Sequence, residues 1–573
     1  MKKQKAKAIP KLNQFLQKRS TIIILLVFVC IIGLPLRMQN IRLNGLISDD
    51  AWWHYRQIKE VVDLGHRLNP DIYEFTTLNR PMTYTPLFHY LVAFTYKLFK
   101  SIMPLVKFMH YFNVLEGMLY ILLIYGLSYV ITDDSLSSII GALAAAISYG
   151  VIIRARAGEL MPFVLGDLFA FAGTLLLLIF LKDITHKKAI LLCLVSGILF
   201  GLSLLSWSGG VFIYLPLVFF VFLAIILTKP NLTKLSLELF LVCFIPLVLI
   251  SLSWYLPLIL KYGLNPHTKE MDWFMKGFTV LHQVKPLSFY VFTSGGLPIF
   301  FIPLVFFNSL FKKNAINVFF ICWIILGVVA TYTGWRGYVA VVPIISAIAI
   351  SIGISRIIRF LFKEDSRYLP LAFILVFLLV GLSGYRISRL RFAPLDPKNV
   401  NEVRTNEKSI KMLKFLQNKY PNAVTIDHIS WMSEDEAVGF LRMVAGQYLE
   451  YLPAGSSEAL KDTSRVYLSD EENAYKICQK YNTDLVIVRQ QFLQLAQLSL
   501  LFAPREINSD DYLKITKEVE GSNEITINFT PKGTQTILFR MLNRQKLNRF
   551  ELVYADQDKN TSLPFVVVYK VNK

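Results

Sequence analysis

The stretch SDDAWWHYR, residues 48–56, places two carboxylates, an imidazole and a guanidinium shortly after a long apolar run, residues 20–36. An apolar run of about 18 residues or more predicts a transmembrane helix. Charged groups at the bilayer surface, beside aromatic side chains that suit the membrane interface, favour a site for a divalent metal or another cation. A solvated loop beside a belt of interfacial aromatic residues would explain the same stretch.

The composition predicts a polytopic membrane protein. The chain has 573 residues, of which 54% are hydrophobic and 17% charged, and its mean hydropathy is +0.47. The net charge of +20 would suit nucleic acid, but the Lys and Arg residues lie in short clusters between apolar runs. Such clusters are typical of cytoplasmic loops, so we expect the bilayer and not nucleic acid as a partner. The five cysteines show no zinc spacing and no evident disulfide framework.

The apolar runs predict a transmembrane domain over residues 1–390, with about 11 to 13 spans. Candidate spans lie near residues 20–36, 110–132, 136–153, 160–181, 189–207, 209–228, 235–262, 289–311, 316–333, 338–361 and 369–387. A large first external loop, residues 37–109, would contain an interfacial helix over residues 86–99, because that apolar segment is too short to span.

The loop charges predict the orientation. A Lys-rich N-terminus should stay in the cytoplasm, and every second loop is then basic, except for residues 132–136. The loops between these basic loops should lie on the outer face. They include residues 37–109, the turn at 154–159, the loop at 262–288, Arg336 and the chain after about residue 390.

From about residue 391 the long apolar runs stop. Apolar residues recur at helical spacing in residues 409–420 and 470–481, whereas 423–429, 484–488, 550–554 and 565–571 are strand-like. The sequence therefore predicts an extracytoplasmic mixed α/β domain over residues 391–573.

Five motifs, in their order along the chain, resemble the catalytic subunit of oligosaccharyltransferase in its archaeal form, a member of the GT-C superfamily of membrane glycosyltransferases. They are DAWWHYR (50–56), YTPLFHY (84–90), RARAG (154–158), WRGY (335–338) and the segment from LSDEENA (468–474) to DLVIV (484–488). The resemblance covers most of the chain and implies a GT-C-like α-helical membrane domain followed by the external α/β domain.

The resemblance also implies a reaction. Enzymes of this family transfer a glycan from a polyprenyl (di)phosphate carrier to the Asn side chain of an acceptor polypeptide, within an Asn-x-Ser/Thr sequon, and use Mg²⁺ or Mn²⁺. It implies Asp50 as a metal ligand and as the acid that engages the acceptor amide, which is a poor nucleophile. Arg336, Arg154 and His54 would bind the lipid phosphate, a task for which the planar guanidinium is suited. Each arginine could instead be an interfacial anchor.

Three departures from the family pattern concern the metal and the acceptor. Where a second acidic motif is expected, the chain reads ELMPF (159–163), so Glu159 or Asp167 would be the ligand. His282 stands where the family has a Glu, and an imidazole suits Mn²⁺ better than Mg²⁺, although a lone loop histidine is often no ligand. The sequon-reading Trp-Trp-Asp-Tyr-Gly motif is replaced by SWMSED (430–435), in which Trp431 keeps its place and Asp435 would substitute for the Asp.

Two alternatives stay open beside an oligosaccharyltransferase-like enzyme. One is a GT-C enzyme that uses a polyprenyl-phosphate monosaccharide on a non-sequon acceptor, which the altered sequon motif favours. The other is a transporter or a catalytically silent homologue. Transporters tend to place ionisable residues near the bilayer midplane and to contain repeats, and the sequence shows neither pattern.

Overall fold

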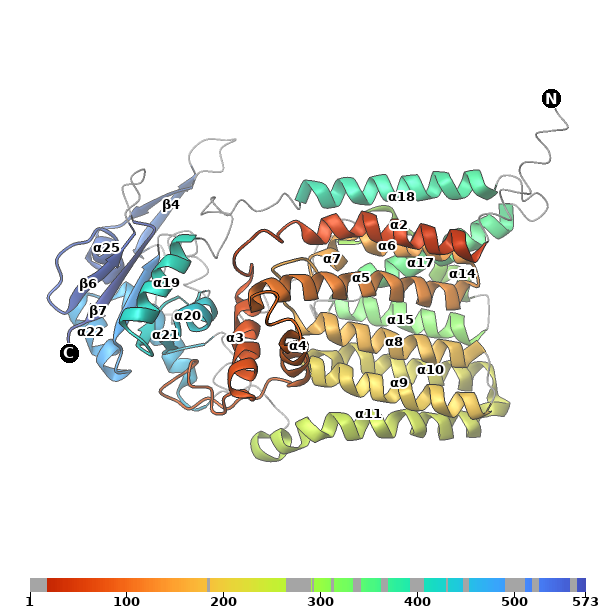
Figure 1. Cartoon of the computed structure of the whole chain (residues 1–573), viewed down its shortest axis with the longest axis horizontal. Coiled ribbons are helices and arrows are strands. Elements are labelled where there is room, and N and C mark those ends of the chain that lie inside the picture. The colour runs from red at the N-terminus through yellow and green to blue at the C-terminus, as the bar shows by residue number, and fades with distance from the viewer. Residues whose placement is uncertain are drawn as a thin grey trace, which may run out of the picture. The chain divides into compact units, whose positions relative to one another are not determined.

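The computed structural model describes residues 18–182, 186–263, 290, 293–310, 314–332, 342–361, 369–391, 407–428, 431–446, 453–489, 511–517, 525–556 and 564–573. The chain divides into two compact units, which are described separately (Figure 1). The first unit comprises Met1–Asn44, Tyr84–Leu260 and His282–Leu395, and the second comprises Gly45–Thr83, Lys261–Leu281 and Asp396–Lys573.

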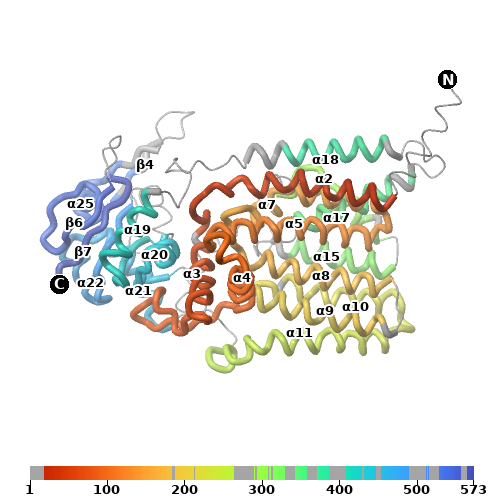
Figure 2. The backbone as a smooth tube through the Cα atoms, viewed as in Figure 1, coloured from red at the N-terminus to blue at the C-terminus, as the bar shows by residue number. Residues whose placement is uncertain are grey.

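The first unit is a bundle of helices that run alongside one another (Figure 2). Its helices of 10 residues or more are α2 (Arg19–Met38), α4 (Leu87–Lys97), α5 (Leu105–Thr132), α6 (Ser135–Ile147), α8 (Pro162–Lys182), α9 (His186–Ser206), α10 (Val211–Thr228), α11 (Thr233–Tyr262), α14 (Phe301–Leu310), α15 (Ala315–Tyr332), α17 (Val342–Leu361) and α18 (Leu369–Arg391). Shorter elements are α7 (Tyr149–Ile152) and the 3-10 turns η1 (Ser208–Gly210), η2 (Pro230–Leu232) and η4 (Leu297–Phe300). Each predicted span coincides wholly or partly with one of these helices.

Among the described residues, six helices are long and apolar enough to cross a membrane by length and composition, and five more are apolar but have 10–17 residues. Large apolar side chains on their outer faces are exposed, such as Ile24, Leu249 and Leu382. A helix surface of this kind suits a hydrocarbon environment, so the helices support a multi-pass membrane protein. The span count of about 11 to 13 stays a prediction.

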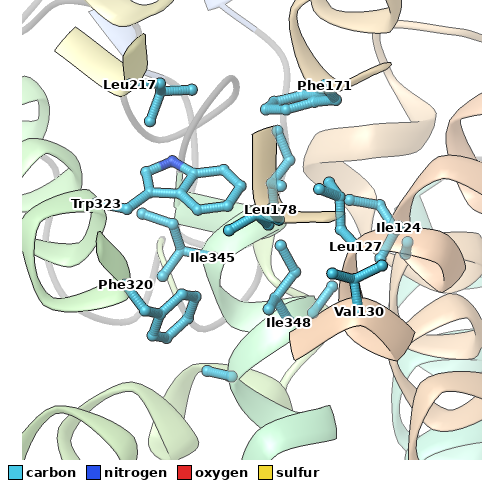
Figure 3. Packing of buried hydrophobic residues seen from close by; sticks show 14 of the residues in the cluster. Ile124, Leu127, Val130, Phe171, Leu178, Leu217, Phe320, Trp323, Ile345 and Ile348 are labelled. Atoms are coloured by element: carbon cyan, nitrogen blue, oxygen red, sulfur yellow. The ribbon is translucent and has the colours of Figure 1, made fainter. Parts of the chain in front are cut away.

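The core of this bundle is apolar and closely packed. Figure 3 shows Phe171 and Leu178 of α8 beside Ile124 of α5, Trp323 of α15 and Ile345 of α17. Trp323 is 1% exposed, and its ring centroid lies 5.9 Å from that of Phe171. Helices α9 and α11 approach so closely at Gly197 that a Cβ there would lie 2.0 Å from the backbone oxygen of Cys243.

The second unit contains a five-stranded mixed sheet in the order β2-β1-β3-β7-β6. The strands are β1 (Val424–Ile426), β2 (Arg442–Met443), β3 (Leu485–Arg489), β6 (Phe550–Ala555) and β7 (Val566–Val571). Strand β1 pairs in parallel with β2 and β3, whereas β7 pairs antiparallel with β3 and β6. All five residues of β3 are buried, which explains why the apolar run at 484–488 was recognisable in the sequence.

Other elements of the second unit are α3 (Asp49–Leu64), α19 (Glu407–Lys419), α20 (Met432–Gly439), α21 (Ser456–Leu468), α22 (Glu471–Lys480), α25 (Ile537–Leu542), η7 (Gly533–Gln535) and a hairpin of β4 (Leu513–Lys517) and β5 (Ile525–Phe529). The predicted helices and strands after residue 391 coincide with α19, α22, β1, β3, β6 and β7. The extracytoplasmic placement of this unit stays a prediction.

Part of the first loop folds with the C-terminal residues. The sequence predicts residues 37–109 as part of the membrane domain, whereas the contacts group Gly45–Thr83 with the C-terminal residues. The backbone N–H of Met443 in β2 donates to the oxygen of Tyr73 at 2.6 Å, and the N–H of Thr76 donates to the oxygen of Met443 at 3.1 Å. Phe75 is buried in the core of the same unit. Pairings between segments so far apart leave no local signature in the sequence.

The contact between α9 and α11 gives a first test. We expect Gly197→Ala to lower the unfolding temperature of the purified full chain, because overpacking of a close contact costs about 1–3 kcal/mol. Gly381→Ala is the matched control, since a Cβ there meets its nearest atom at an ordinary 3.7 Å. Equal unfolding temperatures for the two variants in thermal unfolding would contradict the close approach.

Candidate functional site

Asp50 lies in the first turn of α3, where local interactions fix the start of the helix. Ser48 is the N-cap, and its hydroxyl accepts a hydrogen bond from the N–H of Ala51 at 3.2 Å. The helix ends at Gly65, whose φ of 83° is a left-handed conformation that favours glycine. Asp50 is half-buried, so a rigid backbone holds a carboxylate that keeps contact with the surface.

The aromatic residues that follow Asp50 are part of the protein interior. Trp52 is 3% exposed, Trp53 is 0% exposed and His54 is 2% exposed. Burial lowers the pKa of His54 to about 3, with a smaller contribution from the charge of Arg67. His54 is therefore neutral near pH 7 and could bind a phosphate only as a neutral hydrogen-bond donor. Burial of both tryptophans also speaks against a solvated loop with an interfacial aromatic belt.

Arg56 joins three carboxylates from different parts of the second unit. Its Nη1 lies 2.7 Å from Glu60 Oε1, its Nη2 lies 2.7 Å from Asp71 Oδ2, and its Nε lies 3.1 Å from Glu436 Oε2. All four side chains are buried. Removing one partner from such a group leaves an uncompensated buried charge, which is strongly destabilising. Arg56 therefore fixes α3, and with it Asp50, within this unit.

Trp431 and Asp435 lie one helical turn apart, because the N–H of Asp435 donates to the oxygen of Trp431 at 3.0 Å. Both contact Arg489 at the end of β3. The guanidinium lies 5.4 Å from the centroid of the Trp431 ring, and its Nη2 pairs with Asp435 Oδ1. Arg489 also pairs with Asp427 through Nε at 2.9 Å. The changed spacing of the motif thus still brings the tryptophan and the acid to one face.

Asp435 and Trp431 are almost completely enclosed, at 0% and 1% exposed. Burial raises the pKa of Asp435 well above its usual value, although the charge of Arg489 opposes that shift. Within the described residues, Asp435 Oδ2 and Trp431 Nε1 have no hydrogen-bond partner. The pair therefore offers one buried acceptor and one buried donor to a further group.

In the first unit, Arg154 and Asp167 form a buried ion pair. Arg154 Nη1 lies 2.7 Å from Asp167 Oδ2, and the Tyr120 hydroxyl donates to the same oxygen at 2.9 Å. The guanidinium also lies 4.2 Å from the ring centroid of Phe163. The sequence predicted separate roles, phosphate binding for Arg154 and metal binding for Asp167, whereas the structure brings the two side chains together.

The turn that carries Glu159 is held by its neighbours in the same unit. Arg156 Nη2 pairs with Glu159 Oε1 at 3.0 Å. Asn113 of α5 donates to the backbone oxygens of Arg156 and Glu159, and the N–H of Ala157 donates to the oxygen of Arg37 at 2.7 Å. Glu159 is 8% exposed, so its carboxylate is mostly buried beside Arg156.

A metal site is not assembled within the described part of the chain, where no three His, Cys, Asp or Glu side chains are grouped so that they could hold an ion. His282 and Arg336 lie outside the described residues. Asp167 Oδ1 is buried and has no hydrogen-bond partner in the described ranges. A carboxylate oxygen of this kind fits one position around Mn²⁺ or Mg²⁺, so the residue fits the role of a ligand.

Several residues that shape these sites were missed from the sequence. They are Glu436, Arg489, Tyr120, Asn113 and Arg37. A usable signal existed for Asn113, since a polar residue inside an apolar span is a candidate functional residue. Arg489 also had one, because it directly follows the buried strand-like run 484–488.

Comparison with known proteins adds the family context. A sequence profile described as "Oligosaccharyl transferase STT3, N-terminal" matches residues 22–395. No curated protein sequence matches the chain. The structure is similar to that of the Archaeoglobus fulgidus oligosaccharyltransferase in complex with Zn and sulfate, with a TM-score of 0.73 and 16% identity over 93% of this chain and 79% of that chain.

Other oligosaccharyltransferase structures from Archaeoglobus fulgidus give similar matches. With an inhibitory peptide and a dolichol-phosphate, the TM-score is 0.70 at 14% identity, over 94% of this chain and 80% of that chain. With a tethered acceptor peptide containing an NVT sequon, it is 0.72 at 14% identity, over 97% and 89%. ArnT from Cupriavidus metallidurans bound to undecaprenyl phosphate is less similar, with a TM-score of 0.50 at 10% identity over 84% and 95%. At such low sequence identities, the TM-scores show a shared fold and no more.

The environment of Asp435 gives a second test. We expect Asp435→Ala to destabilise the protein by about 3–5 kcal/mol, because it removes a partner from the buried Arg489, and Asp435→Asn to destabilise it less. Glu472→Ala is the control, since Glu472 pairs with Arg549 at the surface, where the two side chains are 59% and 45% exposed. Thermal unfolding that leaves Asp435→Ala as stable as the control would show that the pair with Arg489 does not support the fold.

Proposed function

Because the chain belongs to the oligosaccharyl transferase STT3 family, whose profile matches residues 22–395, we propose that it is a membrane glycosyltransferase that glycosylates Asn side chains of acceptor polypeptides. The donor is a glycan on a polyprenyl phosphate or diphosphate carrier. The observation that carries the proposal is the placement of Asp50: it is half-buried in the first turn of α3, which Arg56 fixes in the unit that also contains Trp431 and Asp435.

Asp50 engages the acceptor amide in this proposal. Its carboxylate accepts a hydrogen bond from the Asn side-chain N–H and takes that proton as the amide nitrogen bonds to the anomeric carbon of the glycan. The bond between that carbon and the carrier oxygen breaks, and its electron pair stays on the phosphate. A carboxylate that is held by a capped helix needs little reorganisation for this task.

Trp431 and Asp435 recognise the acceptor. A Ser or Thr hydroxyl is both a donor and an acceptor. It can accept a hydrogen bond from Trp431 Nε1 and donate one to Asp435 Oδ2, the two buried atoms for which the described residues provide no partner. This arrangement would read the third position of a sequon with residues spaced differently from those of the family motif.

The donor phosphate is bound by Arg336, Arg154 and His54, with His54 acting as a neutral donor. Asp50, Glu159, Asp167 and His282 are proposed ligands of Mn²⁺ or Mg²⁺. When bound, the ion would neutralise the charge that develops on the leaving phosphate. The oxygen Oδ1 of Asp167, which is buried and lacks a hydrogen-bond partner among the described residues, supports that assignment. The N-terminus lies in the cytoplasm, and the C-terminal unit is extracytoplasmic.

A second candidate function keeps the fold and changes the substrates. The enzyme would transfer a monosaccharide from a polyprenyl phosphate to a non-sequon acceptor. The altered sequon motif favours this reaction, and the fold is also similar to that of ArnT bound to undecaprenyl phosphate. A catalytically silent homologue would bind a lipid-linked glycan without consuming it.

Transfer to a sequon peptide tests the main proposal. The full chain in lipid nanodiscs, with a lipid-linked glycan and Mn²⁺, is expected to glycosylate a labelled Asn-x-Thr peptide and not its Gln-x-Thr counterpart. Asp50→Ala is expected to lower the rate by about 10²–10⁴-fold, because it removes the group that accepts the proton. Asp63→Ala is the matched control on α3, since Asp63 is exposed and pairs only with Lys59 among the described partners.

The outcomes separate the candidates. Full activity in Asp50→Ala would refute the assigned role of that residue. Consumption of a lipid-phosphate sugar without modification of either peptide would favour the second function, and binding of the donor without consumption would favour a silent homologue.

Metal dependence gives a further test. We expect a chelator to abolish transfer and Mn²⁺ to restore it at least as well as Mg²⁺, because an imidazole ligand from His282 favours the softer ion. The measurement is the initial rate of peptide glycosylation after chelation and after each metal is added back. Transfer that continues unchanged in excess chelator would contradict the proposed role of the ion.

A further inference from the structure

Helix α20 carries three consecutive acids, Glu434, Asp435 and Glu436, and all of them are buried, at 1%, 0% and 0% exposed. Successive residues of an α-helix point about 100° apart, so neighbouring acids meet different partners. Asp435 pairs with Arg489 of β3, whereas Glu436 pairs with Arg56 of α3. Helix α20, which follows Trp431 directly, thus connects the sheet to α3, the helix that begins with Asp49 and Asp50.

The pair of Glu436 and Arg56 is placed to control the start of α3. Arg56 follows Asp50 by six residues, which is less than two helical turns. Helices α3 and α20 pack against each other, and Nε of Arg56 reaches Glu436 Oε2 at 3.1 Å with both side chains buried. A shift at Arg56 would therefore be carried along the rigid helix to Asp50.

Charges around Glu436 show that its role differs from that of a simple ion pair. The groups that face it are Arg56 and Glu60 from α3, and Asp71 and Arg80 from the segment that follows α3. Arg80 is itself paired with Glu74. Acids outnumber arginines in this cluster, and burial raises the pKa of Glu436 to about 8. Near pH 7 the side chain is thus mostly protonated, and it meets Arg56 as a buried neutral dipole 3.1 Å from the guanidinium.

We propose that Glu436 is a positioning residue that holds the Asp50 end of α3 in register with Trp431 and Asp435, so that the acceptor amide meets the catalytic carboxylate. This inference rests on the proposed function for the roles of Asp50 and Trp431. The two acids of α20 have different roles. Asp435 anchors α20 to the sheet through Arg489, and Glu436 aligns α3 against α20 through Arg56.

The test compares Glu436→Ala with Glu436→Gln in the full chain in nanodiscs. Glu436→Ala is expected to lower kcat for a sequon peptide by about 10- to 100-fold, because a displacement of about 1 Å can have an effect of that size. The KM for the peptide should stay within twofold, since Trp431, Asp435 and Arg489 are unchanged. Glu436→Gln keeps the shape and a neutral polar group beside Arg56, so it should keep kcat near that of the wild type. Glu472→Ala, at the exposed pair with Arg549, is the control and should resemble the wild type.

A measurement that does not need activity separates this inference from the proposed function. Leu64 of α3 and Lys476 of α22 are both exposed. Spin labels at these two positions report the distance between α3 and α22 by electron paramagnetic resonance. We expect Glu436→Ala to shift or broaden that distance distribution, and Glu436→Gln and Glu472→Ala to preserve it. If the wild type transfers no glycan but the distances change as expected, the proposed function fails and the structural coupling stands.

Two results would overturn the inference. One is an unchanged distance distribution together with an unchanged kcat in Glu436→Ala. The other is a raised KM with an unchanged kcat, which would assign Glu436 to acceptor binding. If Glu436→Ala does not fold, the isosteric Glu436→Gln decides. A loss of kcat in Glu436→Gln, with the fold intact, would show that alignment needs the carboxyl group itself and would contradict alignment by a neutral side chain of this shape.

Discussion

A buried guanidinium must keep its acidic partners, and this constraint organises both units of the protein. Arg489 lies between Asp427 and Asp435, Arg56 is surrounded by three carboxylates, and Arg154 pairs with Asp167. The desolvation of such charges is large and is offset only when their geometry is well satisfied. Loss of any one acidic partner would leave a buried arginine with an uncompensated charge. The residues proposed for catalysis and recognition are therefore held in fixed positions, which favours a preorganised site.

The helices and most of the sheet were predictable because their signals are local. Apolar runs of membrane length mark α2, α5 and α8 without reference to the rest of the chain, and the buried strand β3 is a continuous apolar run. The two-residue strand β2 gave no such signal. The sequence also gave no sign that Gly45–Thr83 associates with the C-terminal residues. This association depends on backbone hydrogen bonds that join Tyr73 and Thr76 to Met443, some 370 positions away.

Motifs in the sequence indicated candidate site residues, but not the side chains that contact them. Asp50, Trp431 and Asp435 were proposed from motifs, and their roles stay predictions. The structure places Asp50 in the first turn of α3, Trp431 directly before α20 and Asp435 on α20. The pairing of Arg154 with Asp167 could not be inferred, since nothing in a sequence tells whether an arginine near the membrane faces a phosphate or a carboxylate. No role for Glu436 was predicted from the sequence, and its burial against Arg56 is what distinguishes it from a solvated acid.

Buried polar atoms that lack a partner in the described residues are informative about what the protein binds. Each such atom costs about 1–3 kcal/mol, so a fold retains it where another group completes the hydrogen bonds. In the second unit, a donor on Trp431 and an acceptor on Asp435 together suit a hydroxyl group, whereas in the first unit an unaccompanied carboxylate oxygen of Asp167 suits a cation. These are different chemistries, and the proposed reaction, with a polypeptide acceptor and a phosphate leaving group, would use both.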